Sequence, residues 1–176
     1  MMAAEPVSYQ RDFFRLSYPM GWSVRETPLG LTEFRPADAA GGSSAPYPSG
    51  IALITIAETG MALEPLLRTG LYFITRDLRS PAIERLGEQR APGDDGDDDD
   101  DGDGLSWYRL LVRGRAASMQ PHGAGEAPSS LDVVKRVALS RPGPGVLVLA
   151  LYGPSSGIDV LGAVFESLLR SVRIVR

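Results

Sequence analysis

The sequence predicts an α+β fold in which helices pack against a central antiparallel sheet. Three observations predict this class: strand-like runs follow one another through short turns, only two segments have helical spacing, and the order strands, helix, strands, helix lacks the repeating βαβ pattern of parallel sheets. A length of 176 residues with 43% apolar and 23% charged residues is typical of one globular domain. We assign residues 13–176 to this domain and residues 1–12 to an N-terminal arm.

Turn residues divide the first part of the domain into short strands. Proline and glycine at 19–21 and again at 28–30 mark tight turns. The segments between and around them predict a β-meander with strands at 13–18, 22–26 and 31–35. Residues 36–50 are expected to form a flexible loop. The continuous β-rich run 51–57 is typical of a central strand that is covered on both faces.

The first helical segment covers residues 61–79. Its apolar residues recur at steps of three and four, which places them on one face: Leu63, Leu66, Leu67, Leu71, Ile74 and Leu78. Thr59 is a candidate N-cap, and Ser80-Pro81 is expected to end the helix.

Strands return in the second half of the chain. Residues 82–90 predict a weak strand, and residues 106–115 predict a clear one whose apolar face carries Tyr108, Leu110 and Val112. Strands at 131–140 and 146–152 flank a connection rich in proline and glycine, which indicates a hairpin. The last helix is expected from Ser156 or Gly157 to about 171, with a buried stripe of Val160, Leu161, Val164, Phe165, Leu168 and Leu169. Residues 172–175 alternate and predict a short closing strand.

The composition excludes several kinds of chemistry. Cysteine is absent, so disulfides, thiolate catalysis, iron–sulfur clusters and thiolate zinc sites are excluded. His122 is the one histidine, and no nucleophile elbow or phosphate-binding glycine motif is present, so we expect no enzyme activity and no catalytic residue. No apolar run reaches the roughly 18–20 residues that span a membrane, and the N-terminus lacks the features of a signal peptide.

The net charge of −4 combines a basic body with one acidic segment. Residues 94–103 contain eight aspartates, and without them 18 basic residues stand against 14 acidic ones, a balance of +4. The surrounding loop, residues 91–104, is too charged and too rich in glycine to fold alone.

Part of this loop resembles the start of a calcium-binding EF-hand. Asp97, Asp99 and Asp101 fit its first positions, but the twelfth position, which needs a bidentate glutamate, falls on Tyr108 inside a predicted strand. We therefore interpret 91–104 as a solvated acidic insertion. Weak calcium binding by Asp97, Asp99 and Asp101 is the alternative.

Basic residues gather on two predicted neighbouring strands: Arg109, Arg113, Arg115, Lys135 and Arg136. We expect them to form one basic face of the sheet. This face is a solvated strand surface in the interpretation we prefer, and a docking surface for acidic protein partners in the alternative. Nucleic acid is not expected to bind, because the whole chain is acidic and aromatic residues are not interleaved with these charges.

Several segments, in the same order along the chain, resemble the PsbP-domain family. Residues 14–22 resemble the opening F-x-(I/L)-x-x-P-x-x-W motif of the family, and residues 107–113 resemble its aromatic-led strand. Residues 133–150 resemble the hairpin that follows, and residues 165–172 resemble the closing helix. The resemblance spans nearly all of residues 13–175.

This resemblance implies an α/β/α sandwich around an antiparallel sheet. It also implies a monomeric, non-catalytic protein of the chloroplast thylakoid lumen, in its mature form, that acts as a peripheral auxiliary, stabilising or assembly factor of photosystem II, of the oxygen-evolving-complex type, or of a related thylakoid complex. The chain lacks the long lysine-rich arm of the photosystem II subunit, and His122 alone cannot supply the family's histidine metal sites. The alternative is a bacterial or nuclear binding module or chaperone of the same fold, of the Ran-binding type, in the periplasm or cytoplasm.

Overall fold

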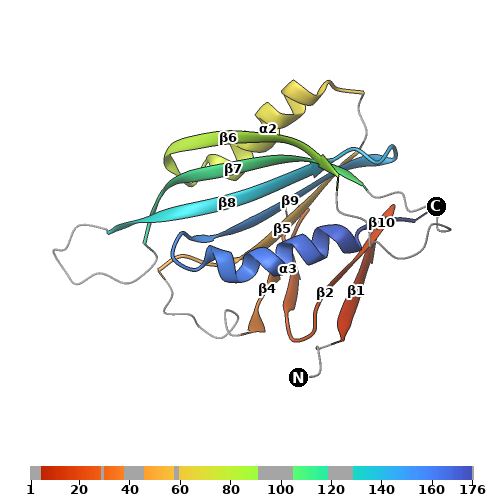
Figure 1. The fold of residues 1–176 in the computed structure, drawn as a ribbon, viewed down its shortest axis with the longest axis horizontal. Coiled ribbons are helices and arrows are strands. Elements are labelled where there is room, and N and C mark those ends of the chain that lie inside the picture. The colour runs from red at the N-terminus through yellow and green to blue at the C-terminus, as the bar shows by residue number, and fades with distance from the viewer. Residues whose placement is uncertain are drawn as a thin grey trace.

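The structure is a computed structural model, and it describes residues 5–28, 30–37, 46–57, 60–90, 105–118 and 129–175. These residues form ten strands in two antiparallel sheets, together with helices α2 and α3 (Figure 1). In chain order the elements are β1 (Pro6–Arg11), β2 (Phe14–Pro19), β3 (Ser23–Glu26), β4 (Leu31–Arg35), β5 (Gly50–Ala57), α2 (Leu63–Thr75), β6 (Arg79–Arg90), β7 (Ser106–Ala117), β8 (Ser130–Ser140), β9 (Gly145–Pro154), α3 (Ile158–Ser171) and β10 (Arg173–Ile174).

Seven strands form the large sheet, in the order β3-β4-β5-β9-β8-β7-β6. Its centre is β9, where every residue except Pro154 is buried. Leu149 of β9 lies opposite Leu53 of β5 on one side and Ala138 of β8 on the other. A continuous apolar run fits this position because side chains on both faces are covered. The expected central strand at 51–57 and the expected hairpin around 141–145 are confirmed as β5 and β8–β9.

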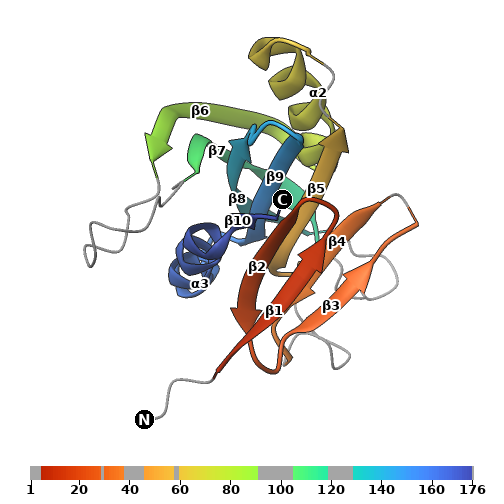
Figure 2. The ribbon, with the colours of Figure 1, turned by 90° about the vertical axis from the view of Figure 1, so that its right-hand side faces the viewer.

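The two helices cover opposite faces of the large sheet (Figures 1 and 2). Helix α2 buries Leu66, Leu67 and Ile74 in a cluster with residues of β7, β8 and β9. Helix α3 buries Phe165, Leu168 and Leu169 in a second cluster on the other face. The predicted α/β/α sandwich is confirmed. No helix among the described residues is long and apolar enough to cross a membrane.

The expected N-terminal meander is divided between two sheets. Strand β2 pairs with β1 and β10 in a small three-stranded sheet, whereas β3 and β4 belong to the large sheet. The chain turns away after Pro19, where Gly21 takes a positive φ of 84° and the amide of Trp22 donates a hydrogen bond to the Pro19 carbonyl. Phe14 and Leu16 nevertheless lie in the core cluster of α3, so the two sheets share one core.

The segment expected to be an N-terminal arm contributes a strand to the small sheet. Strand β1 pairs with β2 over its whole length, and Val7 and Tyr9 alternate with exposed residues. The Tyr9 ring lies 5.4 Å from that of Phe34 in an edge-on contact, and its hydroxyl donates to Glu26. The ordered domain therefore begins before residue 13.

Helix α2 differs from the prediction at both ends, and helix α3 differs in which residues of its predicted stripe are buried. Helix α2 begins after Ala62, which provides no side-chain cap, and Thr59 lies outside the described residues. It ends at Thr75, four residues earlier than expected. In α3 the buried line runs through Ile158 and Gly162, and Val160 is 80% exposed because it lies on the outer side of the first turn.

Candidate functional site

The basic residues predicted on one sheet face lie on two faces. Arg136 points toward α3, whereas Lys135 points toward α2, because consecutive residues of a strand face opposite sides. Strand β7 is covered on both faces: Trp107 is buried on the α3 side and Leu110 and Val112 on the α2 side. The expected single basic face is therefore wrong.

Helix α3 binds two of the predicted arginines. Arg109 donates two parallel hydrogen bonds to Glu166, at 3.1 and 2.8 Å, and its guanidinium lies 5.9 Å from the centre of the Phe165 ring. Arg136 donates to Asp159 at 2.6 Å. The largely buried Arg109 thus fixes α3 on the sheet, whereas the pair of Arg136 with Asp159 is exposed to solvent.

The outer end of the same face keeps exposed ion pairs. Arg113 lies 3.6 Å from Glu84, and Arg115 lies 3.6 Å from Asp132, with both guanidiniums exposed to solvent. Arg113 stays a predicted partner-binding residue. Asp97, Asp99, Asp101 and His122 lie outside the described residues, so their predicted roles are unchanged.

Lys135 belongs to a partly buried polar cluster beneath the end of α2. Its ammonium donates to the Ile74 carbonyl at 2.6 Å and to Asp77 at 2.7 Å, and the Tyr47 hydroxyl donates to the other Asp77 oxygen at 2.5 Å. Partial burial alone would raise the pKa of Asp77, but the hydrogen bonds from Lys135 and Tyr47 outweigh burial and lower it. Burial, with the hydrogen bond to Asp77 second, raises the pKa of Tyr47. This cluster closes the last turn of α2, so Lys135 stabilises the fold.

A different set of polar residues is open to solvent. Ser8, Arg15, Ser17, Ser171 and Arg173 line a groove of about 390 Å³, which we call the arginine–serine groove. It lies where the small sheet meets the C-terminal end of α3, on the side of the large sheet away from α2 (Figure 2).

Strand register brings the groove residues together. Arg15 and Ser17 alternate with the buried Phe14 and Leu16, so their side chains leave the core. Ser8 lies opposite Ser17, and Arg173 lies opposite Arg15. The groove therefore has one row of arginine and one row of serine.

Hydrogen bonds hold one side of the groove in place. The Ser171 hydroxyl accepts the Ser17 amide at 2.8 Å and donates to the Leu168 carbonyl at 2.7 Å, which ties the end of α3 to β2. Arg173 donates to the Arg170 carbonyl at 2.6 Å and to the Val172 carbonyl at 3.0 Å. These bonds hold the Arg173 side chain against the C-terminal end of α3.

The groove carries two arginines that form no ion pair within the described part of the chain. Like charges directly opposite one another on paired strands destabilise a sheet, and Arg15 and Arg173 form such a pair. The ion pairs formed by the described residues include neither of them, nor the exposed Arg170, whose carbonyl accepts a hydrogen bond from Arg173. Guanidinium groups with adjacent hydroxyls are donors suited to carboxylate or phosphate oxygens. Within the described ranges, no group of three potential metal ligands occurs.

The groove was missed at the sequence level. Arg15 and Arg173 each showed the alternation of an exposed strand residue, and 172–175 was expected as a strand. The missing information was the pairing of β10 with β2, which joins segments from opposite ends of the chain.

Comparisons with known proteins identify the fold. No family model and no curated protein matches the sequence. Among solved structures, the solution structure of cyanobacterial PsbP from Synechocystis is similar with a TM-score of 0.56 and 14% identity, over 99% of this chain and 94% of that one. The Ran-binding protein Mog1p of Saccharomyces cerevisiae is similar with a TM-score of 0.56 and 12% identity, over 98% and 96% of the two chains. The fold implied by the sequence motifs is therefore confirmed, and it is shared with Mog1.

Proposed function

We propose that this protein is a non-catalytic binding module that docks on an acidic segment of another protein through the arginine–serine groove. The observation that carries the proposal is the opposed pair Arg15 and Arg173, neither of which belongs to an ion pair with another described residue. An acidic partner would remove the repulsion that the unoccupied sheet retains.

The chemistry of the lining residues favours binding over catalysis. Arginine stays protonated at all physiological pH values, and a serine hydroxyl needs a neighbouring base to act as a nucleophile. The five residues that line the groove contain no such base. They donate hydrogen bonds to oxygen atoms, which is what recognition of acidic side chains requires.

We further propose that the partner belongs to a photosynthetic membrane complex and that the protein works in the thylakoid lumen as an accessory factor. The sequence motifs and the structural similarity to cyanobacterial PsbP support this assignment. The similarity to a Ran-binding protein supports the second candidate, a Ran-type binding module outside the chloroplast. A binding assay distinguishes the two candidates. The thylakoid accessory factor should bind to salt-washed photosystem II membranes, and the Ran-type module should bind to purified Ran.

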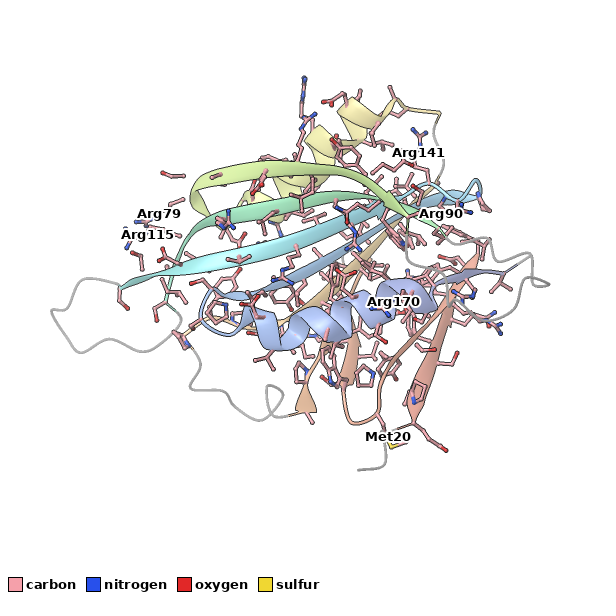
Figure 3. All side chains as sticks on the ribbon, viewed as in Figure 1. Met20, Arg79, Arg90, Arg115, Arg141 and Arg170 are labelled. Atoms are coloured by element: carbon pink, nitrogen blue, oxygen red, sulfur yellow. The ribbon has the colours of Figure 1, made fainter. Side chains whose placement is uncertain are left out.

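The groove itself is tested with a labelled peptide of alternating aspartate and glutamate, with binding measured by fluorescence anisotropy. Arg15→Glu/Arg173→Glu should weaken binding at least about tenfold, equivalent to about 1.4 kcal/mol. The control is Arg79→Glu, which makes the same type of charge change at the far end of the sheet from Arg170 (Figure 3). Binding that falls as salt rises and survives the control supports the proposal. Equal affinity in the wild type and the groove variant would refute it.

A further inference from the structure

A pair of aromatic side chains projects from α2 into solvent. Tyr72 is 67% exposed and Phe73 is 54% exposed, and their rings meet edge-on at 5.6 Å between centroids. The guanidinium of Arg76 lies 5.9 Å from the centre of the Phe73 ring. Large aromatic side chains normally bury much of their surface, so this exposure calls for a partner.

The exposed arc of the helix combines these rings with positive charge. Arg68, Tyr72 and Arg76 follow one another at steps of four residues, and Phe73 lies beside them, opposite the buried Leu67 and Ile74. We call Arg68, Tyr72, Phe73 and Arg76 the α2 outer face.

Two described acidic residues near this arc, Glu64 and Asp77, already have basic partners, and Glu64 also attracts Arg68. Glu64 forms an ion pair with Arg85, and Asp77 forms one with Lys135. The ion pairs recorded for the described part of the chain do not include Arg68 or Arg76. The α2 outer face is therefore both apolar and cationic.

We infer that the α2 outer face is a contact surface for an anionic lipid bilayer. Aromatic rings favour the interface between headgroups and acyl chains, and arginines beside them pair with lipid phosphates. Helix α2 is the outermost element on its side of the large sheet (Figures 1 and 2), so it can meet a flat surface without obstruction from the described elements. The groove lies on the other side of that sheet, and thus the lipid contact goes beyond the proposed protein docking.

The test is co-sedimentation of the full chain with vesicles of phosphatidylcholine alone and with one-third phosphatidylglycerol added. The wild type should sediment with the anionic vesicles and not with the neutral ones. Each arginine near an anionic surface contributes roughly fivefold in affinity, so Arg68→Gln/Arg76→Gln should reduce binding by roughly 25-fold. Tyr72→Ser/Phe73→Ser should reduce it at least about tenfold.

Matched controls keep the result specific to this face. Val160→Ser removes a more exposed apolar residue from α3 and should leave binding unchanged. Arg15→Glu/Arg173→Glu should also bind vesicles normally, which separates this inference from the groove. In a Phe73→Trp variant, tryptophan fluorescence should shift to the blue with anionic vesicles. No sedimentation of the wild type, full binding by Tyr72→Ser/Phe73→Ser, or self-association through this face in light scattering would overturn the inference.

Discussion

Replacing Asp77 with asparagine should destabilise the fold much more than replacing its partner Lys135 with methionine. Removing one partner of a buried ion pair costs about 3–5 kcal/mol, because the other charge stays buried without compensation. Here the Lys135 side chain is 9% exposed, whereas that of Asp77 is 43% exposed. Solvent screening at Asp77 lowers the expected cost of Asp77→Asn to about 2 kcal/mol.

The reverse substitution leaves a charge that water can reach. In Lys135→Met the Asp77 carboxylate keeps the hydrogen bond from Tyr47 and contacts solvent, while the Ile74 carbonyl loses its donor. We expect a cost of about 1 kcal/mol for that lost hydrogen bond. The double variant Asp77→Asn/Lys135→Met should recover part of the loss, because no unpaired buried charge remains.

Urea unfolding followed by the fluorescence of the buried Trp107 measures these differences. Asp159→Asn is the control, since its side chain is 87% exposed and the pair with Arg136 should contribute less than about 0.5 kcal/mol. A loss for Asp77→Asn no larger than that of the control, or smaller than that of Lys135→Met, would refute the reasoning.

The same pair makes stability depend on pH. The pKa of Asp77 is lowered in the fold, so its contribution is present above the unfolded value of about 3.9 and is lost as the pH falls through the lower folded value. The advantage of the wild type over Asp77→Asn should therefore shrink below about pH 4. An advantage that stays constant from neutral pH to pH 2 would contradict this.

Three further results are expected. Burial raises the pKa of Tyr47 and Tyr152, so neither should ionise near pH 10 in an absorbance titration. The free energy of unfolding should fall as the pH rises above about 10, because the two tyrosines ionise more readily in the unfolded chain. Ionisation of both together with the exposed tyrosines would contradict their burial. Gly162→Ala should stabilise α3 by about 0.5 kcal/mol in thermal unfolding, because an added Cβ meets only the flexible end of the Arg136 side chain. Gly50→Ala should instead destabilise the fold by about 2 kcal/mol, because its Cβ would clash with a backbone oxygen and the Tyr152 hydroxyl. Similar effects of the two substitutions would show that these contacts do not matter. Calorimetric titration with calcium should show weak binding that disappears when the eight-aspartate segment is deleted, and tight binding that survives the deletion would place the site elsewhere.

Alternating apolar residues and turn residues predicted most of the large sheet, because turn residues mark both ends of its central strands in the sequence. The run 51–57 and the two strands around the Pro/Gly connection are long, apolar and flanked by breakers, so neighbouring structure has little freedom to override them. The end of α2 was not predictable in the same way. Leu78 continues the helical spacing, but it is buried from the turn that follows α2, where its side chain fits against Gly114.

One feature of the candidate site could have been predicted from the sequence, and two others could not. Lys135 and Arg136 are consecutive residues of a strand, so a period of two already placed them on opposite faces. The contact of Arg109 with α3 could not be predicted, because the pattern of a strand does not indicate which helix packs on that strand. It also does not indicate which helix supplies a carboxylate such as that of Glu166. The groove needed the pairing of β2 with β10, which no local pattern specifies.

The position of β2 between β1 and β10 has a consequence for biosynthesis. One neighbour of β2 is translated just before it, and the other only after nearly all the described residues have been made. A nascent chain on the ribosome can form the β1–β2 hairpin while one edge of β2 stays unpaired. Arg173 joins Arg15 only when β10 has emerged, so the arginine–serine groove is not complete before that strand has been made.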